Sequence, residues 1–292
     1  MFERILFPTD FSEVSLGALR ACVPKLFEMG AKKLFVVHVI EVVPEDPNVL
    51  DKIEFETRKK LDELVEELKD TGINVEASLG IGPVTPAIAH EARCPSIEIV
   101  DKAACEMVDL IVMPSRGKHA RRRMQIGSTA RNVVRKSSVP VLVLKYDWNE
   151  EKGEIKCLGD CEKMFEKPLI ALDLSPCSEL VISVTRKFAE KIKKAMLYHV
   201  VDYGDIEEIE ENTNKAKNAL DIYAKKLGVE SECIVDAGIA AKEILVKALE
   251  LNSTMVVMGK VGRGWLKEIL LGSTADEVLK EAKAPTLLVP CR

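Results

Sequence analysis

Residues 255–274 read MVVMGKVGRGWLKEILLGST, and this stretch decides the fold. Its first four residues are a continuous apolar run, which is typical of a strand buried on both faces of a parallel sheet. Glycines follow at 259, 262 and 272, and a helical pattern begins after the last of them. A buried strand, a glycine-rich loop and a helix in this order predict an α/β domain.

The same order of signals occurs twice along the chain. The matching stretches are 5–12 with 169–175, 34–39 with 195–200, 110–117 with 255–262, and 139–145 with 284–290, and a glycine follows a third strand at Gly82 and at Gly238. Helical periodicity fills the intervals, as in 54–72 and 214–228, which both end on a glycine. Because strands and helices alternate, we expect two tandem doubly wound domains, each a five-stranded parallel sheet with helices on both faces.

Polar residues separate the two halves. Residues 147–166 sustain neither a strand nor a helix period. We therefore expect domain 1 at 1–146, a linker at 147–166 and domain 2 at 167–292.

Composition excludes several classes of function. With 292 residues, 47% of them hydrophobic, the chain suits two globular domains. The net charge of -5 and the scattered basic residues argue against nucleic-acid binding. The apolar runs are too short to cross a bilayer and no leader pattern is present, so we expect a cytoplasmic protein without a membrane partner.

Eight cysteines are present. Those in apolar segments, such as Cys22, Cys105 and Cys233, are expected to be buried free thiols. Cys157 and Cys161 form a CxxxC pair, for which a metal ligand, a redox disulfide and no role all stay open. Two cysteines do not complete a zinc site, so no metal site is assigned.

The glycine loop predicts a phosphate site. Gly259, Gly262 and Gly272 allow the backbone amides to converge on an anion. Ser273 and Thr274 open a helix whose amino-terminal amides and dipole also attract negative charge.

Two residues separate the first glycine from the second, nine separate the second from the third, and Ser or Thr follows the third. This pattern resembles the ATP-binding signature of the UspA-like universal stress proteins. The resemblance extends to the aspartate after strand one, the His-Val strand and the closing apolar strand of each half, which together span nearly the whole chain. It implies an adenine nucleotide alpha hydrolase-like fold that binds ATP, ADP or AMP, with or without Mg²⁺. It also implies an intramolecular pseudodimer, its halves packed face to face with 139–145 beside 284–290, and leaves a further homodimer open.

In that family the strand-one aspartate lies by the sugar and adenine, the strand-two valine pairs with adenine, and the glycine loop holds phosphate. The resemblance implies that the site in domain 2 comprises Asp173, Val200, Met258, Gly259, Gly262, Arg263, Gly272, Ser273 and Thr274. An alternative for Asp173 is that it only caps the following helix.

A weaker site is implied in domain 1, comprising Asp10, Val39, Met113, Arg116, Gly117, Gly127, Ser128 and Thr129. Pro114 replaces the first glycine there, which removes one amide donor. Arg116 and the run 121–123 either compensate with charge-assisted bonds or form a solvated face.

The sequence patterns are compatible with three functions. The leading expectation is a stress-associated nucleotide-binding module with at most slow hydrolysis and no assigned catalytic residue. A nucleotide hydrolase or pyrophosphatase of the same fold is the first alternative, although its Ser-Gly-Gly-x-Asp-Ser loop is missing. A structural pseudodimer with a decayed first site is the second. His38 and His199 are expected to be structural.

Overall fold

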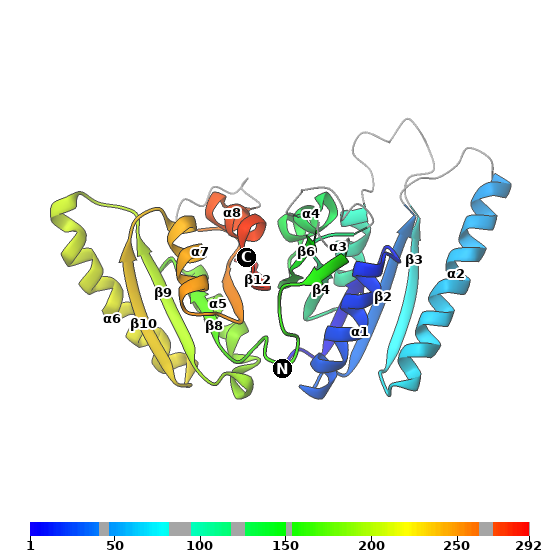
Figure 1. Ribbon diagram of the computed structural model, residues 1–292, viewed down its shortest axis with the longest axis horizontal. Coiled ribbons are helices and arrows are strands. Elements are labelled where there is room, and N and C mark those ends of the chain that lie inside the picture. The colour runs from blue at the N-terminus through cyan, green and yellow to red at the C-terminus, as the bar shows by residue number, and fades with distance from the viewer. Residues whose placement is uncertain (41–46, 82–94, 118–125, 150–153, 263–270, 292) are drawn as a thin grey trace.

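One ten-stranded sheet runs through both halves of the chain (Figure 1). The computed structural model describes residues 1–40, 47–81, 95–117, 126–149, 154–262 and 271–291. The strand order is β10-β9-β8-β11-β12-β5-β4-β1-β2-β3, so each half repeats one five-stranded arrangement. All neighbours within a half are parallel, which confirms the two doubly wound domains expected from the alternation of strands and helices.

The elements of the first half follow the predicted order. They are β1 (Arg4–Pro8), α1 (Glu13–Glu28), β2 (Lys33–Ile40), α2 (Pro47–Asp70), β3 (Val75–Ile81), α3 (Pro95–Cys105), β4 (Leu110–Pro114), α4 (Ser128–Lys136) and β5 (Val141–Leu144). Ser12 begins α1 as its N-cap, where its side chain accepts a hydrogen bond from the Ser15 amide.

The second half repeats this order with two added short 3-10 helices. Its elements are β8 (Pro168–Ala171), α5 (Cys177–Arg186), η2 (Ala189–Lys191), β9 (Ala195–Val201), η3 (Ile206–Glu208), α6 (Ile209–Leu227), β10 (Ser231–Ala237), α7 (Ala240–Glu250), β11 (Met255–Gly259), α8 (Ser273–Glu281) and β12 (Thr286–Val289). Gly228 ends α6 with φ 75°, as the glycine there predicted. No helix in the described ranges is long and apolar enough to cross a membrane.

The two halves join through their last strands. β12 pairs with β5 in the antiparallel direction, with Leu287 opposite Leu142. The predicted pairing of 139–145 with 284–290 is therefore confirmed. The expected face-to-face packing is wrong, because hydrogen bonding between two exposed strand edges extends one sheet across both halves and places α2 and α6 at its opposite ends (Figure 1).

Helices cover both faces of this sheet. The buried side chains of α1, α2, α5 and α6 form a core on one face, and those of α3, α4, α7 and α8 form a core on the other. Successive residues of β5 alternate between the two cores, with Leu142 and Leu144 in the first and Val141 and Val143 in the second. Both cores continue across the junction, so the chain folds as one pseudosymmetric body.

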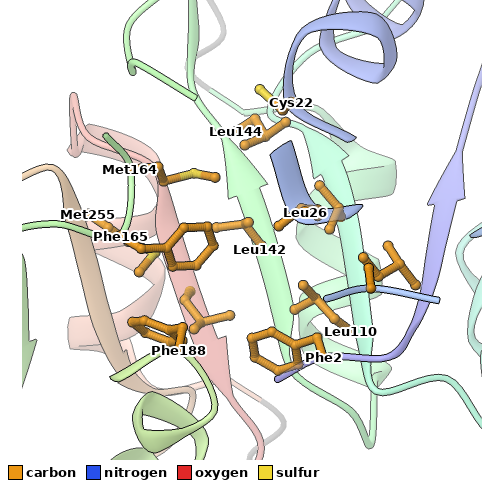
Figure 2. Close-up of a cluster of buried hydrophobic side chains, with 14 of the residues drawn as sticks. Phe2, Cys22, Leu26, Leu110, Leu142, Leu144, Met164, Phe165, Phe188 and Met255 are labelled. Carbon is orange, nitrogen blue, oxygen red and sulfur yellow. The ribbon is translucent and has the colours of Figure 1, made fainter. Parts of the chain in front are cut away.

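Aromatic side chains close the junction at the amino ends of the strands (Figure 2). Phe2 of the first half stacks on Phe188 of the second at 6.4 Å between ring centroids. Phe165, from the segment between the domains, lies 4.8 Å from Phe188. Each of these rings is at most 3% exposed, so the interface is a true core.

The segment between the halves is more ordered than its sequence indicated. β6 (Tyr146–Asn149) and β7 (Glu154–Cys157) form an antiparallel hairpin, and Met164 and Phe165 are buried. Each strand alternates apolar and polar residues, as YDWN and EIKC, but over only four positions, which is too short a pattern to stand out from the polar residues around it.

The cysteine expectations need correction. Cys22 is bonded to Cys161, 139 residues away, and Cys177 is bonded to Cys291. Cys105 and Cys233 are free as expected, but Cys105 is exposed and Cys233 half-buried. Of the CxxxC pair, Cys161 forms a disulfide with α1 rather than with Cys157. Chain packing brings these partners within 5.0 Å between Cα atoms, a proximity that spacing along the sequence does not reveal.

Candidate functional site

A pocket lies at the carboxyl ends of the strands in each half. The chain moves outward from β1 to β3 and then returns to β4, so β1 and β4 flank a topological switch point, and β8 and β11 do the same in the second half. Open α/β sheets bind ligands at such points because the loops diverge there. We call the pocket of the first half site 1 and that of the second half site 2.

Site 2 is a cavity of about 520 Å³. Every described residue predicted for this domain lines it, namely Asp173, Val200, Met258, Gly259, Gly262, Gly272, Ser273 and Thr274. Arg263 lies outside the described residues. For the predicted residues, the structure thus brings together the ends of three strands, β8, β9 and β11, and the start of α8.

Site 1 is smaller, at about 330 Å³. It is lined by all the residues predicted for domain 1, namely Asp10, Val39, Met113, Arg116, Gly117, Gly127, Ser128 and Thr129, and also by Pro114. The predicted arginine run 121–123 and Gly82 lie outside the described residues. In both sites the nucleotide-binding role of these residues stays a prediction.

The strand-one aspartates organise the loops that follow them. Asp173 Oδ1 accepts hydrogen bonds from the Ser175 amide at 3.1 Å, from Ser175 Oγ at 2.8 Å and from Ser178 Oγ at 3.1 Å. Asp10 Oδ1 likewise accepts from the amide and hydroxyl of Ser12. Asp173 is not the N-cap of α5, which is Pro176 without a side-chain cap, but its carboxylate does bond to Ser175 in the preceding loop and to Ser178 in the first turn of α5.

The second oxygen of each aspartate lies toward the glycine loop. A Cβ on Gly117 would lie 2.2 Å from Asp10 Oδ2, so only glycine fits this approach. The corresponding distance from Gly262 to Asp173 Oδ2 is 3.4 Å. Site 1 is therefore narrower where loop and carboxylate meet.

A backbone hydrogen bond between described residues joins the two ends of each glycine loop. The Gly272 amide donates to the Lys260 carbonyl at 2.7 Å, and the Gly127 amide donates to the Ser115 carbonyl at 2.7 Å. This bond holds the start of α8 against the end of β11, and the start of α4 against the end of β4.

No described side chain caps the amino end of α4 or α8, whose N-caps are Gly127 and Gly272. The first amides of these helices, with the positive end of the helix dipole, therefore adjoin the pockets without a capping side chain. Such an arrangement favours an anion at this point of each site.

The two strand histidines have structural partners. His38 Nδ1 lies 2.7 Å from the Thr9 carbonyl and His199 Nδ1 lies 2.7 Å from the Leu172 carbonyl, and both rings are buried. Each ring thus ties strand two to the residue before the strand-one aspartate. These contacts agree with the structural role expected from the sequence, and His199 in addition lines site 2.

Site 2 contains residues that sequence reasoning missed. Tyr198, Asp202, Ala240 and Ile244 also line it. Burial, helped by the hydrogen bond to Asp236, raises the pKa of Tyr198, so its hydroxyl stays protonated. Strand alternation could have identified Tyr198, because residues two apart, such as Tyr198 and Val200, share one face of β9.

The comparisons with known proteins agree with this architecture. A model of the universal stress protein family matches residues 1–145 and 164–290. Universal stress protein MJ0577 of Methanocaldococcus jannaschii is 33% identical over 168 residues, which cover 50% of this chain and 96% of that protein. Universal stress protein YxiE of Bacillus subtilis is 30% identical over 150 residues, which cover 50% of this chain and 100% of that protein.

Several solved structures match both halves together, and one of them is a universal stress protein. The crystal structure of a universal stress protein from Archaeoglobus fulgidus has a TM-score of 0.70, with 23% identity, and the match covers 99% of this chain and 96% of that one. This likeness shows a shared tandem fold. With the family model matched twice, the chain belongs to the universal stress protein family and carries two of its domains in tandem.

Proposed function

We propose that the chain is a stress-response module that binds adenine nucleotide, as ATP, ADP or AMP, in both sites. One observation carries this proposal. In each half a pocket at the switch point has an uncapped helix start at one end and the strand-one aspartate beside it. The helix start favours a phosphate group, and a carboxylate is a suitable acceptor for ribose hydroxyls.

The pockets also suit a nucleotide in size and lining. A volume of about 520 Å³ in site 2 falls in the usual range for small-molecule and cofactor sites. The lining also includes the apolar residues Val200, Ile244 and Met258, which offer a surface for a flat base. Where Mg²⁺ accompanies the nucleotide, Asp173 or Asp10 would supply a carboxylate ligand beside the phosphates.

The proposal includes slow hydrolysis at most. Asp173 Oδ1 already accepts three hydrogen bonds that hold the loop, and Asp10 Oδ1 accepts two. These bonds fix the orientation of each carboxylate, and we assign no catalytic base among the described residues of either site. The bound nucleotide would therefore act by stabilising one conformation, as a ligand that binds only the folded form does.

The test first identifies the bound nucleotide and then blocks each site with a substitution. Mass spectrometry of the nucleotide released on denaturation, followed by calorimetry with ATP, ADP and AMP, should show two sites per chain. Ser273→Glu and Ser128→Glu place a carboxylate at the start of α8 and α4, and each should abolish one site by repulsion. Ser138→Glu, exposed beyond the other end of α4, is the matched control. Binding that survives in the Ser128→Glu, Ser273→Glu double variant would overturn the proposal.

A further inference from the structure

Lys260 connects the glycine loop of site 2 to the other domain. It lies between Gly259 and Val261, yet its side chain does not line site 2. Instead its Nζ donates across the junction to the carbonyls of Ser137 at 2.6 Å and Arg135 at 3.1 Å. These carbonyls belong to the carboxyl end of α4, whose amino end forms part of site 1.

Burial makes the hydrogen bonds between Lys260 and α4 important for the free energy of the folded chain. Lys260 is 9% exposed, and an ammonium group taken out of water is costly unless hydrogen bonds replace its hydration. The carboxyl end of α4 supplies the replacement, since its last carbonyls carry the negative end of the helix dipole. The hydrogen bonds from Lys260 to α4 therefore form when the loop and α4 have their present relative position.

The backbone of the same residue holds the start of α8. The Lys260 carbonyl accepts the Gly272 amide at 2.7 Å, so one residue touches the phosphate helix of its own domain and the phosphate helix of the other. Arg131 of α4 adds a direct link, with paired hydrogen bonds of 2.6 and 2.7 Å to the carboxylate of Asp276 on α8.

From these contacts we infer that Lys260 is a positioning residue that couples the two sites, so that nucleotide in one strengthens binding in the other. This inference rests on the proposed function. A phosphate group on the site 2 loop would fix residues 259–262 and so favour the docked lysine, which in turn fixes α4. Both ligands favour the same docked arrangement, and thermodynamic linkage requires the effect to be equal in both directions.

Calorimetry measures the coupling. Ser128→Glu leaves only site 2 and Ser273→Glu leaves only site 1, so these variants give the dissociation constant of each site alone. In the unaltered chain the product of the two dissociation constants should be about fivefold or more below the product of the single-site values. Lys260→Met should bring the ratio of the single-site product to the product in the two-site chain well below fivefold, with the Arg131–Asp276 pair retaining the remainder. Lys260→Arg, which keeps the charge and donors, should restore part of the lost coupling.

Lys145→Met is the matched control. Lys145 is also a buried lysine that crosses the junction, where its Nζ donates to the Leu279 carbonyl at the end of α8, but it lies in neither glycine loop. A purely structural role would make the two methionine variants alike. We expect Lys145→Met to keep the ratio of the unaltered chain, and loss of the ratio in both variants would overturn the role of Lys260.

A second measurement needs no change at Lys260. Nucleotide added to the Ser128→Glu variant, in which only site 2 binds, should slow amide exchange at 132–137 in α4 of the opposite domain. Two results would overturn the coupling but not the proposed function. One is unchanged amide exchange at 132–137, and the other is equal products of dissociation constants in the unaltered chain and the single-site variants, with both sites binding. A chain that binds no nucleotide would overturn the proposed function and the coupling together.

Discussion

Gly259 lies directly against Cys177. A Cβ on Gly259 would lie 2.5 Å from Cys177 Sγ and 3.1 Å from Cys291 Sγ, so the disulfide occupies the space where a side chain would be. In the first half the repeat places Val14 and Tyr146 at the cysteine positions, and Pro114 at the glycine position. The second half thus pairs a glycine with a disulfide where the first half has a proline and two residues that form no disulfide.

The first prediction concerns this space. Gly259→Pro should weaken nucleotide binding in site 2 by about 2 to 4 kcal/mol, because the ring would collide with Cys177 Sγ and displace the loop. This loss corresponds to a decrease in affinity of roughly thirtyfold to nearly a thousandfold. Calorimetry in the Ser128→Glu background, where only site 2 binds, measures it. Pro114→Gly is the reverse change and should leave site 1 intact or strengthen it. Unchanged affinity in Gly259→Pro would show that the glycine loop is not the phosphate site.

The second prediction concerns the disulfide itself. A dithiol reductant that converts Cys177 and Cys291 to thiols should weaken site 2 about tenfold, since two separate sulfur atoms need more room beside Gly259 than a bonded pair does. Site 1 has Val14 and Tyr146 at the two corresponding positions and should not respond. Cys22→Ser removes the other disulfide and should leave this redox dependence of site 2 intact. Equal responses of both sites would contradict the prediction.

The third prediction concerns Lys145 and alkaline pH. Burial lowers the pKa of Lys145 to about 7, whereas in the unfolded chain it stays near its ordinary value. Between these values the unfolded chain binds more protons, so stability should rise with pH, by at most about 1.4 kcal/mol per pH unit from this group. Urea denaturation at pH 6.5, 7.5 and 8.5 measures it. In Lys145→Met the free energy of unfolding should rise less with pH. If it changed with pH equally in the variant and the unaltered chain, the low pKa of Lys145 would be ruled out.

The fourth prediction concerns Asp109 and acid. Burial raises the pKa of Asp109, but the amides of Arg4 and Glu3 and the ammonium of Lys187 outweigh burial, so its pKa lies below the usual range. The stability it contributes is complete above the usual pKa and disappears as the pH falls below it. Asp109→Asn should cost about 1 to 3 kcal/mol at pH 7.

The same substitution should cost progressively less below pH 4, as measured by urea denaturation at pH 7, 5 and 3.5. The control is Glu211→Gln, which removes a fully exposed ion pair with Lys215. It should cause no measurable change in the free energy of unfolding at any of these pH values. A constant difference between Asp109→Asn and the unaltered chain across this range would contradict the assignment.

The sequence by itself determined the architecture of each half and the composition of both pockets. Apolar runs, helical periods and glycines are local patterns, and the end of each strand must lie at one edge of a parallel sheet. Asp173, Gly262 and Ser273 could therefore be assigned to one pocket although a hundred residues separate the first from the last.

Only the tertiary structure decided how the halves meet. The edge-to-edge junction of β5 with β12, the Cys22–Cys161 bond and the reach of Lys260 to α4 join residues with no shared local pattern. The Lys260 side chain is an ordinary charged group in the sequence, and it acquires a partner only when docking buries it against the carboxyl end of a helix from the other domain. Contacts of this kind depend on the free energy of packing whole surfaces, which no short stretch of sequence encodes.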